Sequence, residues 1–194
     1  MDATHWVLAI FLGVSLAAST GFNTFLPLAL LSAAAKWHLA GVELTGPFAW
    51  LGSDAALIAL GVATVIEVIA DKIPAVDHAL DTFGTFLRPL VGSAAFAAAL
   101  GHADPVTASI LGLIVGGATT FGVHTAKSGT RVLSTASTLG CANPLLSALE
   151  DFTAAGLTLT GLFLPLLVPF AIALLVWGVV ALTKKVSLRK GRED

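Results

Sequence analysis

Long apolar segments without charge constrain this chain more than any other feature of its sequence. The stretch from Leu57 to Ile66, LIALGVATVI, is one of several, and the apolar residues come in continuous runs. Only 11% of the residues are charged, against about 25% in a soluble domain. The mean hydropathy is +0.91. Because a membrane barrel requires alternating strands, the runs predict an all-α, polytopic helical membrane bundle.

The runs predict about five to seven transmembrane or re-entrant helices in a single integral membrane domain over residues 1–194. Several runs are shorter than the roughly 20 residues that a full span needs, so the count is a range. Pro74 removes a backbone hydrogen bond, and we expect the helix that contains Glu67 to be broken near Pro74. Leu12–Phe22 and Leu111–Phe121 form a faint repeat, which either a duplication or close helix packing explains.

The basic residues of the C-terminal end predict the orientation of the chain. The tail KKVSLRKGRED, residues 184–194, carries five of the ten Lys and Arg residues and follows the last apolar run directly. The positive-inside rule therefore places this tail, and the C-terminus, in the cytoplasm. The one cysteine, Cys141, excludes an internal disulfide and a cysteine zinc cluster.

The few remaining charges gather beside the apolar runs, most densely in EVIADKIPAVDHALDTF, Glu67–Phe83. This stretch is expected to line the polar space between a kinked helix and its neighbours. An isolated charge in lipid is costly, so we expect the charged groups to converge within salt-bridge distance. The acidic candidates are Glu67, Asp71, Asp77, Asp81, Glu150 and Asp151, and the basic candidates are Lys72, Arg88, Lys127 and Arg131.

Helical spacing makes some of these residues neighbours. Glu67 and Asp71 are four apart on one face. A second stripe consists of His124, Lys127 and Arg131, and a third of Asn143, Ser147 and either Glu150 or Asp151. His78 and His124 are candidate proton relays, and Asn143 and Ser147 are supporting polar groups. Each histidine is more simply a hydrogen-bonded structural group, and a metal role is left open.

Three segments of the chain are similar to a known family. EVIADKIPAVDHALDTFGTFLRPL, GVHTAKSGTRV and NPLLSALED resemble small bacterial integral membrane proteins of the domain-of-unknown-function family 4126, and the opening STGFNTFLPLALLSAAAKW resembles its N-terminal block. The resemblance covers nearly the whole chain. It implies a protein of the bacterial cytoplasmic membrane and assigns no activity.

The charges favour a membrane transport or permeation protein that moves a small cation or is coupled to protons. Burial raises the pKa of a carboxyl group, which lets protonation alternate with cation binding. Glu67 is the expected key carboxylate because it follows the apolar run directly. The sequence assigns no cofactor, and a bound cation is the one candidate.

Three alternatives stay open at this point. The four basic residues could grip a phosphorylated lipid or another anion. The ion pairs could instead hold a scaffold that transports nothing. A metal-dependent membrane enzyme is the least favoured, because no catalytic motif is present. The expected partners are membrane lipids and a small ion or anionic molecule, with no nucleic acid; small-residue runs such as SAAFAAALG leave a homo-oligomer open.

Overall fold

The computed structural model describes residues 2–190, without the side chains of 74, 75, 77, 78, 179 and 182–190. All regular structure in this range is helical, and no strand occurs within it. The α-helices are α1 (Ala3–Phe22), α2 (Leu26–Lys36), α3 (Asp54–Ala70), α4 (Pro74–Ala99), α5 (Pro105–Leu111), α6 (Gly117–Thr138), α7 (Asn143–Phe163) and α8 (Val168–Lys190). The all-helical prediction is confirmed.

Short tight segments join the α-helices. Two 3-10 segments, η1 (Leu39–Gly41) and η2 (Gly46–Gly52), lie between α2 and α3. A π-helical segment, η3 (Gly112–Gly116), links α5 to α6, so that the two form one continuous helical run. A third 3-10 segment, η4 (Pro165–Leu167), separates α7 from α8.

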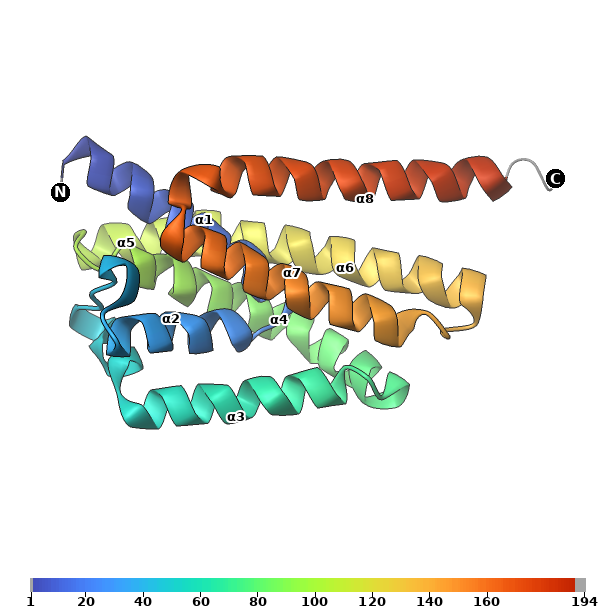
Figure 1. Cartoon of the computed structure of the whole chain (residues 1–194), viewed down its shortest axis with the longest axis horizontal. Helices are drawn as coiled ribbons and strands as arrows, with labels where there is room; N and C mark the ends of the chain where they lie inside the picture. Colours follow the sequence, from blue (N-terminus) through green and yellow to red (C-terminus); the bar gives the residue numbers. More distant parts are fainter. Residues whose placement is uncertain (1, 191–194) are drawn as a thin grey trace.

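The first two α-helices form a hairpin inside the bundle. Figure 1 shows α1 running in from one end and α2 returning toward that same end. Between them, Asn23 is extended, with a φ of −138°, and ends α1. The turn at residues 23–25 therefore lies among the other helices rather than at an end of the bundle, and its free backbone groups need partners there.

The predicted break near Pro74 is confirmed. Helix α3 ends at Ala70, and α4 begins at Pro74, which occupies the first turn where a missing N–H costs nothing. Pro89 lies inside α4 without ending it, so one helix carries the charged stretch into the apolar segment that follows. The side chains of Asp77 and His78 in its first turns lie outside the described part of the structure.

Polar and apolar residues are distributed in the reverse of a soluble protein. Phe83, Phe86 and Phe170 are more than 70% exposed, whereas Arg88 is 1% exposed and Lys127 2% exposed. Helix α1 packs against α4, α6 and α7, and Figure 1 shows α8 along the outside of this group. The buried interior therefore holds charged side chains beside its apolar core.

Two helical runs within residues 2–190 are long and apolar enough to cross a membrane: Ala3–Phe22 and the 34-residue run Pro105–Thr138. Gly46–Gly52 and Asp54–Ala70 pass the same test together but are bent by 72°, which makes up to three. The count of five to seven helices, the internal duplication and the cytoplasmic C-terminus stay predictions. Residues 191–194 and the side chains of 182–190 lie outside the description.

Candidate functional site

The hairpin turn between α1 and α2 exposes backbone N–H groups at the start of α2. Asn23 satisfies one of them, because its Oδ1 accepts from the backbone N of Leu26 at 3.0 Å. The N–H groups of the two preceding residues, Thr24 and Phe25, are satisfied by a carboxylate from another helix, Glu67 of α3. The positive end of the α2 dipole also favours a negative charge at this point.

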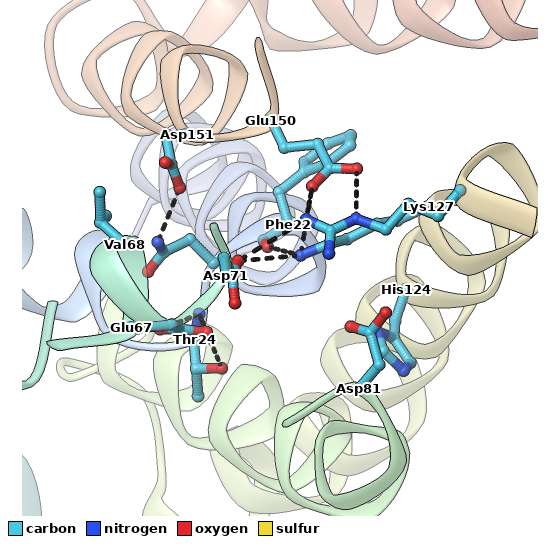
Figure 2. Close-up of polar contacts among 12 residues, drawn as sticks. Phe22, Thr24, Glu67, Val68, Asp71, Asp81, His124, Lys127, Glu150 and Asp151 are labelled. Carbon is cyan, nitrogen blue, oxygen red and sulfur yellow. Dashed lines mark hydrogen bonds and ion pairs between the residues drawn. The ribbon is translucent and has the colours of Figure 1, made fainter. Parts of the chain in front are cut away.

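Glu67 is bonded on both of its oxygens. The backbone N–H of Thr24 lies 3.0 Å from Oε1 and 2.9 Å from Oε2, and the Thr24 hydroxyl donates to Oε1 at 2.7 Å. The backbone N–H of Phe25 donates to Oε2 at 3.1 Å, and Nη2 of Arg88 lies 3.3 Å from Oε1. Glu67 therefore caps α2 across 43 residues of sequence, and Figure 2 shows it facing Thr24.

Arg88 connects this cap of α2 to the end of α1, on the other side of the hairpin turn. Its Nη1 lies 3.4 Å from the carbonyl oxygen of Gly21 at the end of α1, and 3.6 Å from Oδ1 of Asp81. The same Nη1 lies 2.9 Å from Nδ1 of His124. Arginine has only donors, so His124 Nδ1 accepts, and a neutral ring carries its proton on Nε2, 3.2 Å from the Thr85 hydroxyl.

A second group of charges lies on the other side of the hairpin turn. Lys127 Nζ donates to the carbonyl oxygen of Phe22 at 2.8 Å and thereby caps the negative end of α1. It also lies 3.5 Å from Asp71 Oδ2 and 3.4 Å from Glu150 Oε2. Arg131 Nη2 lies 2.5 Å from Glu150 Oε2 and 3.7 Å from Asp71 Oδ2. Figure 2 shows Asp71, Lys127 and Glu150 turned toward one another.

Among the described residues, six charged side chains are at least nine-tenths buried, and their charges sum to zero. Three are acidic and three are basic: Glu67, Asp71, Glu150, Arg88, Lys127 and Arg131. Buried charges are tolerated when they are paired and hydrogen-bonded, so the neutral sum accounts for the number of charges in the interior. We call these six residues the ionic cluster.

Asp151 forms a more accessible pair at the edge of the ionic cluster. Its Oδ1 accepts from Asn23 Nδ2 at 3.0 Å, and its Oδ2 lies 3.5 Å from Lys72 Nζ. The Asp151 side chain is 17% exposed and that of Lys72 is 42% exposed. The pair therefore joins the hairpin turn to the region outside the ionic cluster.

An open cavity of about 520 Å³ adjoins the ionic cluster, and we call it the Asp71 cavity. Its walls come from the ends of α3 and α7 and from α4 and α6, and include Asp71, Lys72, Asp81, Thr85, Arg131 and Asn143. Three buried side-chain oxygens of these residues have no hydrogen-bond partner among the described residues: Asp71 Oδ1, Asp81 Oδ1 and Asn143 Oδ1. This wall can accept hydrogen bonds or bind a cation.

Comparison with known protein families identifies one family to which the chain is similar. The family described as a domain of unknown function (DUF4126) matches residues 10–185. The chain belongs to this family. Its description names no activity, and no curated protein or solved structure matches the chain. The matched range includes the whole ionic cluster of this DUF4126 member.

The predicted convergence of the charged residues is confirmed. All four basic candidates, Lys72, Arg88, Lys127 and Arg131, lie within 4.0 Å of a predicted carboxylate. Asn143 lines the Asp71 cavity, whereas the buried Ser147 hydroxyl has no hydrogen-bond partner among the described residues. The roles assigned to all these residues stay predictions, as do those of Asp77 and His78.

Sequence reasoning did not select Asn23 and Thr24, which bond to Asp151 and Glu67 across the interior. Pro27 is the sequence feature that could have indicated their capping role. A proline belongs in the first turn of a helix, and Asn is a preferred capping residue. Asn23 four residues before Pro27 therefore marks a helix start, and the carboxylate that completes this cap is visible only in the tertiary structure.

Proposed function

We propose that this protein moves protons or small monovalent cations across a membrane, with Asp71 as the carboxylate that takes up the ion. The observation that carries the proposal is the state of the two Asp71 oxygens. Oδ2 lies beside Lys127 and Arg131, whereas the buried Oδ1 lacks a described hydrogen-bond partner in a side chain that lines an open cavity. A carboxylate in this position can bind an ion without first breaking a hydrogen bond.

The same reasoning moves the key role away from Glu67. Protonation of Glu67 would weaken five hydrogen bonds and uncap α2 inside the protein. Those bonds hold the hairpin turn in one conformation. Glu67 is therefore assigned a structural role in this proposal, and Asp71 the transport role.

Lys127 supplies the element that responds to the ion. Its Nζ lies almost equally far from Asp71 Oδ2 and Glu150 Oε2, at 3.5 and 3.4 Å. When an ion neutralises Asp71, the attraction on that side falls and Lys127 is drawn toward Glu150. Since Lys127 also holds the Phe22 carbonyl oxygen, the shift is transmitted to the end of α1.

The exterior and the helix break support membrane transport. Large apolar side chains cover the outside, and a broken helix lies in the interior beside charges, as in transporters whose half-helices end at the ion site. Figure 1 shows α8 ending at the same end of the bundle as the turn between α6 and α7, which borders the Asp71 cavity. With the basic tail in the cytoplasm, this cavity faces the cytoplasm.

The ligand set favours a proton or a monovalent ion over a divalent one. Ca²⁺ takes six to eight oxygen ligands, and transition metals recruit histidine. Within the described part of the chain, no three His, Cys, Asp or Glu side chains are grouped to hold a metal ion. The proposal is therefore limited to ions that one carboxylate with neutral oxygen neighbours can accept.

Reconstitution into proteoliposomes tests the proposal. With a potassium diffusion potential as driving force, we expect the wild type to carry an H⁺ or Na⁺ flux, read with a pH dye and a sodium dye. Asp71→Asn keeps the side-chain shape and should lower this flux by about tenfold or more. The matched control is Asp104→Asn, which changes an exposed carboxylate outside the ionic cluster. Wild-type vesicles that carry neither ion would refute the proposal and favour a scaffold.

A second candidate is transport of an amphipathic anion such as a phosphorylated lipid. A cavity of about 320 Å³ between α8 and the bundle has apolar walls that include Phe22, Leu149 and Leu174, and it reaches Lys127 and Glu150. Its shape suits an acyl chain below a charged headgroup. We rank it second because Lys127 already lies between two carboxylates, which oppose an anion.

A further inference from the structure

The interface between α1 and α7 carries a line of buried polar side chains that the ionic cluster does not use. Ser15 and Ser19 of α1 and Asn23, directly after its end, follow one another at a spacing of four residues, and each is 0% exposed. On α7, Thr158 is likewise 0% exposed. We call these four residues the polar stripe.

Two contacts fix how the polar stripe lies between the helices. Near one end, the Ser15 hydroxyl donates to the carbonyl oxygen of Leu157 at 2.5 Å. At the other end, Asn23 donates to Asp151. The helices are therefore antiparallel. Ser19 lies between these two levels, which are about 12 Å apart along α1, and Thr158 follows Leu157 directly, at the Ser15 end.

The hydroxyls of Ser19 and Thr158 have no hydrogen-bond partner among the described residues. Many other helical hydroxyls donate to a carbonyl oxygen of their own helix, although the buried Ser134 and Ser147 hydroxyls also lack a described partner. Thr20 donates to Leu16 at 2.8 Å, and Thr153 donates to Leu149 at 2.7 Å. A buried hydroxyl without a partner costs free energy, so water is the natural partner of these two groups.

Each end of the polar stripe lies close to a residue that lines a cavity. One is an open cavity of about 350 Å³ at the end of the bundle opposite the Asp71 cavity, and we call it the Gly161 cavity. Gly161 lies in its wall, and a Cβ on Gly161 would lie 2.5 Å from Ser15 Oγ. At the other end, Asp151 pairs with Lys72, which lines the Asp71 cavity.

We infer that the polar stripe is a proton path between the two cavities, and that the ion of the proposed function is H⁺. This inference rests on that proposed function and names its ion. A hydroxyl can accept one proton and release its own, so Ser15, Thr158 and Ser19 with bridging water pass a proton along the interface. The Asp151 carboxylate accepts it, becomes a neutral acid and then releases the proton beside Lys72 into the Asp71 cavity.

The packing between α1 and α7 explains why the path is selective. Gly161 approaches Ser15 so closely that a single added methyl group would overlap it. A hydrated Na⁺ or K⁺ does not fit through such a contact, whereas a proton passes from oxygen to oxygen without moving a bulky ion. The path is therefore specific for protons by its dimensions.

Removing the two unpartnered hydroxyls tests this inference. Ser19→Ala and Thr158→Val preserve the packing volume, and removing an orphan hydroxyl is neutral or stabilising. In proteoliposomes we expect the double variant to lose H⁺ flux by about tenfold or more, with an unchanged or higher unfolding temperature. Thr153→Val, on the side of α7 that faces α8, is the matched control and should keep the wild-type flux.

The outcomes separate this inference from the proposed function. An H⁺ flux that is lost in Asp71→Asn but unchanged in the double variant would overturn the polar stripe and leave the transport function standing. A wild-type Na⁺ flux would likewise overturn the assignment of H⁺ alone. A wild type without any flux would overturn both. If the double variant loses flux together with its unfolding transition, the two hydroxyls are structural and the path is rejected.

Discussion

Glu67 and Asp71 occupy two regions of one helix end that differ in chemistry although they are equally buried. The two carboxylates are one turn apart, and their residues are 6% and 5% exposed. Glu67 accepts five hydrogen bonds and closes the hairpin turn, whereas no hydrogen bond to Oδ1 of Asp71 occurs within the described residues. The difference teaches that equal burial does not mean equal bonding. The proposed function assigns the ion to Asp71 because this carboxylate has fewer hydrogen bonds to give up.

The largest expected effect is on the Glu67 side of this comparison. Glu67→Gln keeps the shape of the side chain but removes the nearer and more deeply buried of the two carboxylates beside Arg88, and it weakens the cap of α2. We expect a loss of about 3–5 kcal/mol in the free energy of unfolding, because breaking a buried ion pair is strongly destabilising. Denaturant unfolding in detergent, followed by circular dichroism, measures it. Wild-type stability in this variant would contradict the structural role of Glu67.

Thr24 tests the same region through its hydroxyl group. This hydroxyl donates to Glu67 and accepts from Nε of Arg88 at 3.2 Å. Thr24→Ala removes two bonds to charged groups, and we expect it to cost about 2–3 kcal/mol of unfolding free energy. Thr24→Ser keeps the hydroxyl and is the control. Equal losses in the two variants would show that packing of the methyl group, and not the hydroxyl, matters.

Asp71→Asn is expected to show the opposite profile, with a small loss of stability and a large loss of flux. Glu150 remains beside both Lys127 and Arg131, so we expect only about 1–2 kcal/mol in unfolding free energy. Paired measurements of unfolding and ion flux on Asp71→Asn and Glu67→Gln sharpen the comparison. If Asp71→Asn is less stable than Glu67→Gln, the assignment of a structural role to Glu67 and a transport role to Asp71 is wrong.

The smallest effect is expected at Asp104, an exposed residue that caps α5 as Glu67 caps α2. Its carboxylate accepts from the backbone N–H of Thr107 at 2.9 Å and from the Thr107 hydroxyl at 3.1 Å, and these bonds lower the pKa of Asp104. A lowered pKa gives stability that is present at neutral pH and lost as pH falls through it. The difference in unfolding temperature between wild type and Asp104→Ala should therefore be small at pH 7 and should decrease as the pH falls through the lowered pKa of Asp104. A difference that persists at low pH would mean that the charge of Asp104 is not its source.

The distribution of polar and apolar residues along the sequence determined the class of fold and the convergence of the charged side chains in the interior. Continuous apolar runs exclude alternating strands, and the charge-poor exterior leaves buried pairing as the stable arrangement for the remaining charges. Pro74 determined where α3 and α4 separate, because a proline fits the first turn of a helix and not its middle. Pro89 shows the limit of this rule, since α4 continues through it.

Only the tertiary structure decided which charge has which partner. Glu67 bonds to Thr24 across 43 residues, and Asn23 bonds to Asp151 across 128. No local spacing encodes such pairs, because they depend on how the hairpin of α1 and α2 inserts among α3, α4, α6 and α7. The polar stripe has the same origin. Ser19 and Thr158 are ordinary helical residues by sequence, and only the packing of α1 on α7 buries their hydroxyls without a described hydrogen-bond partner.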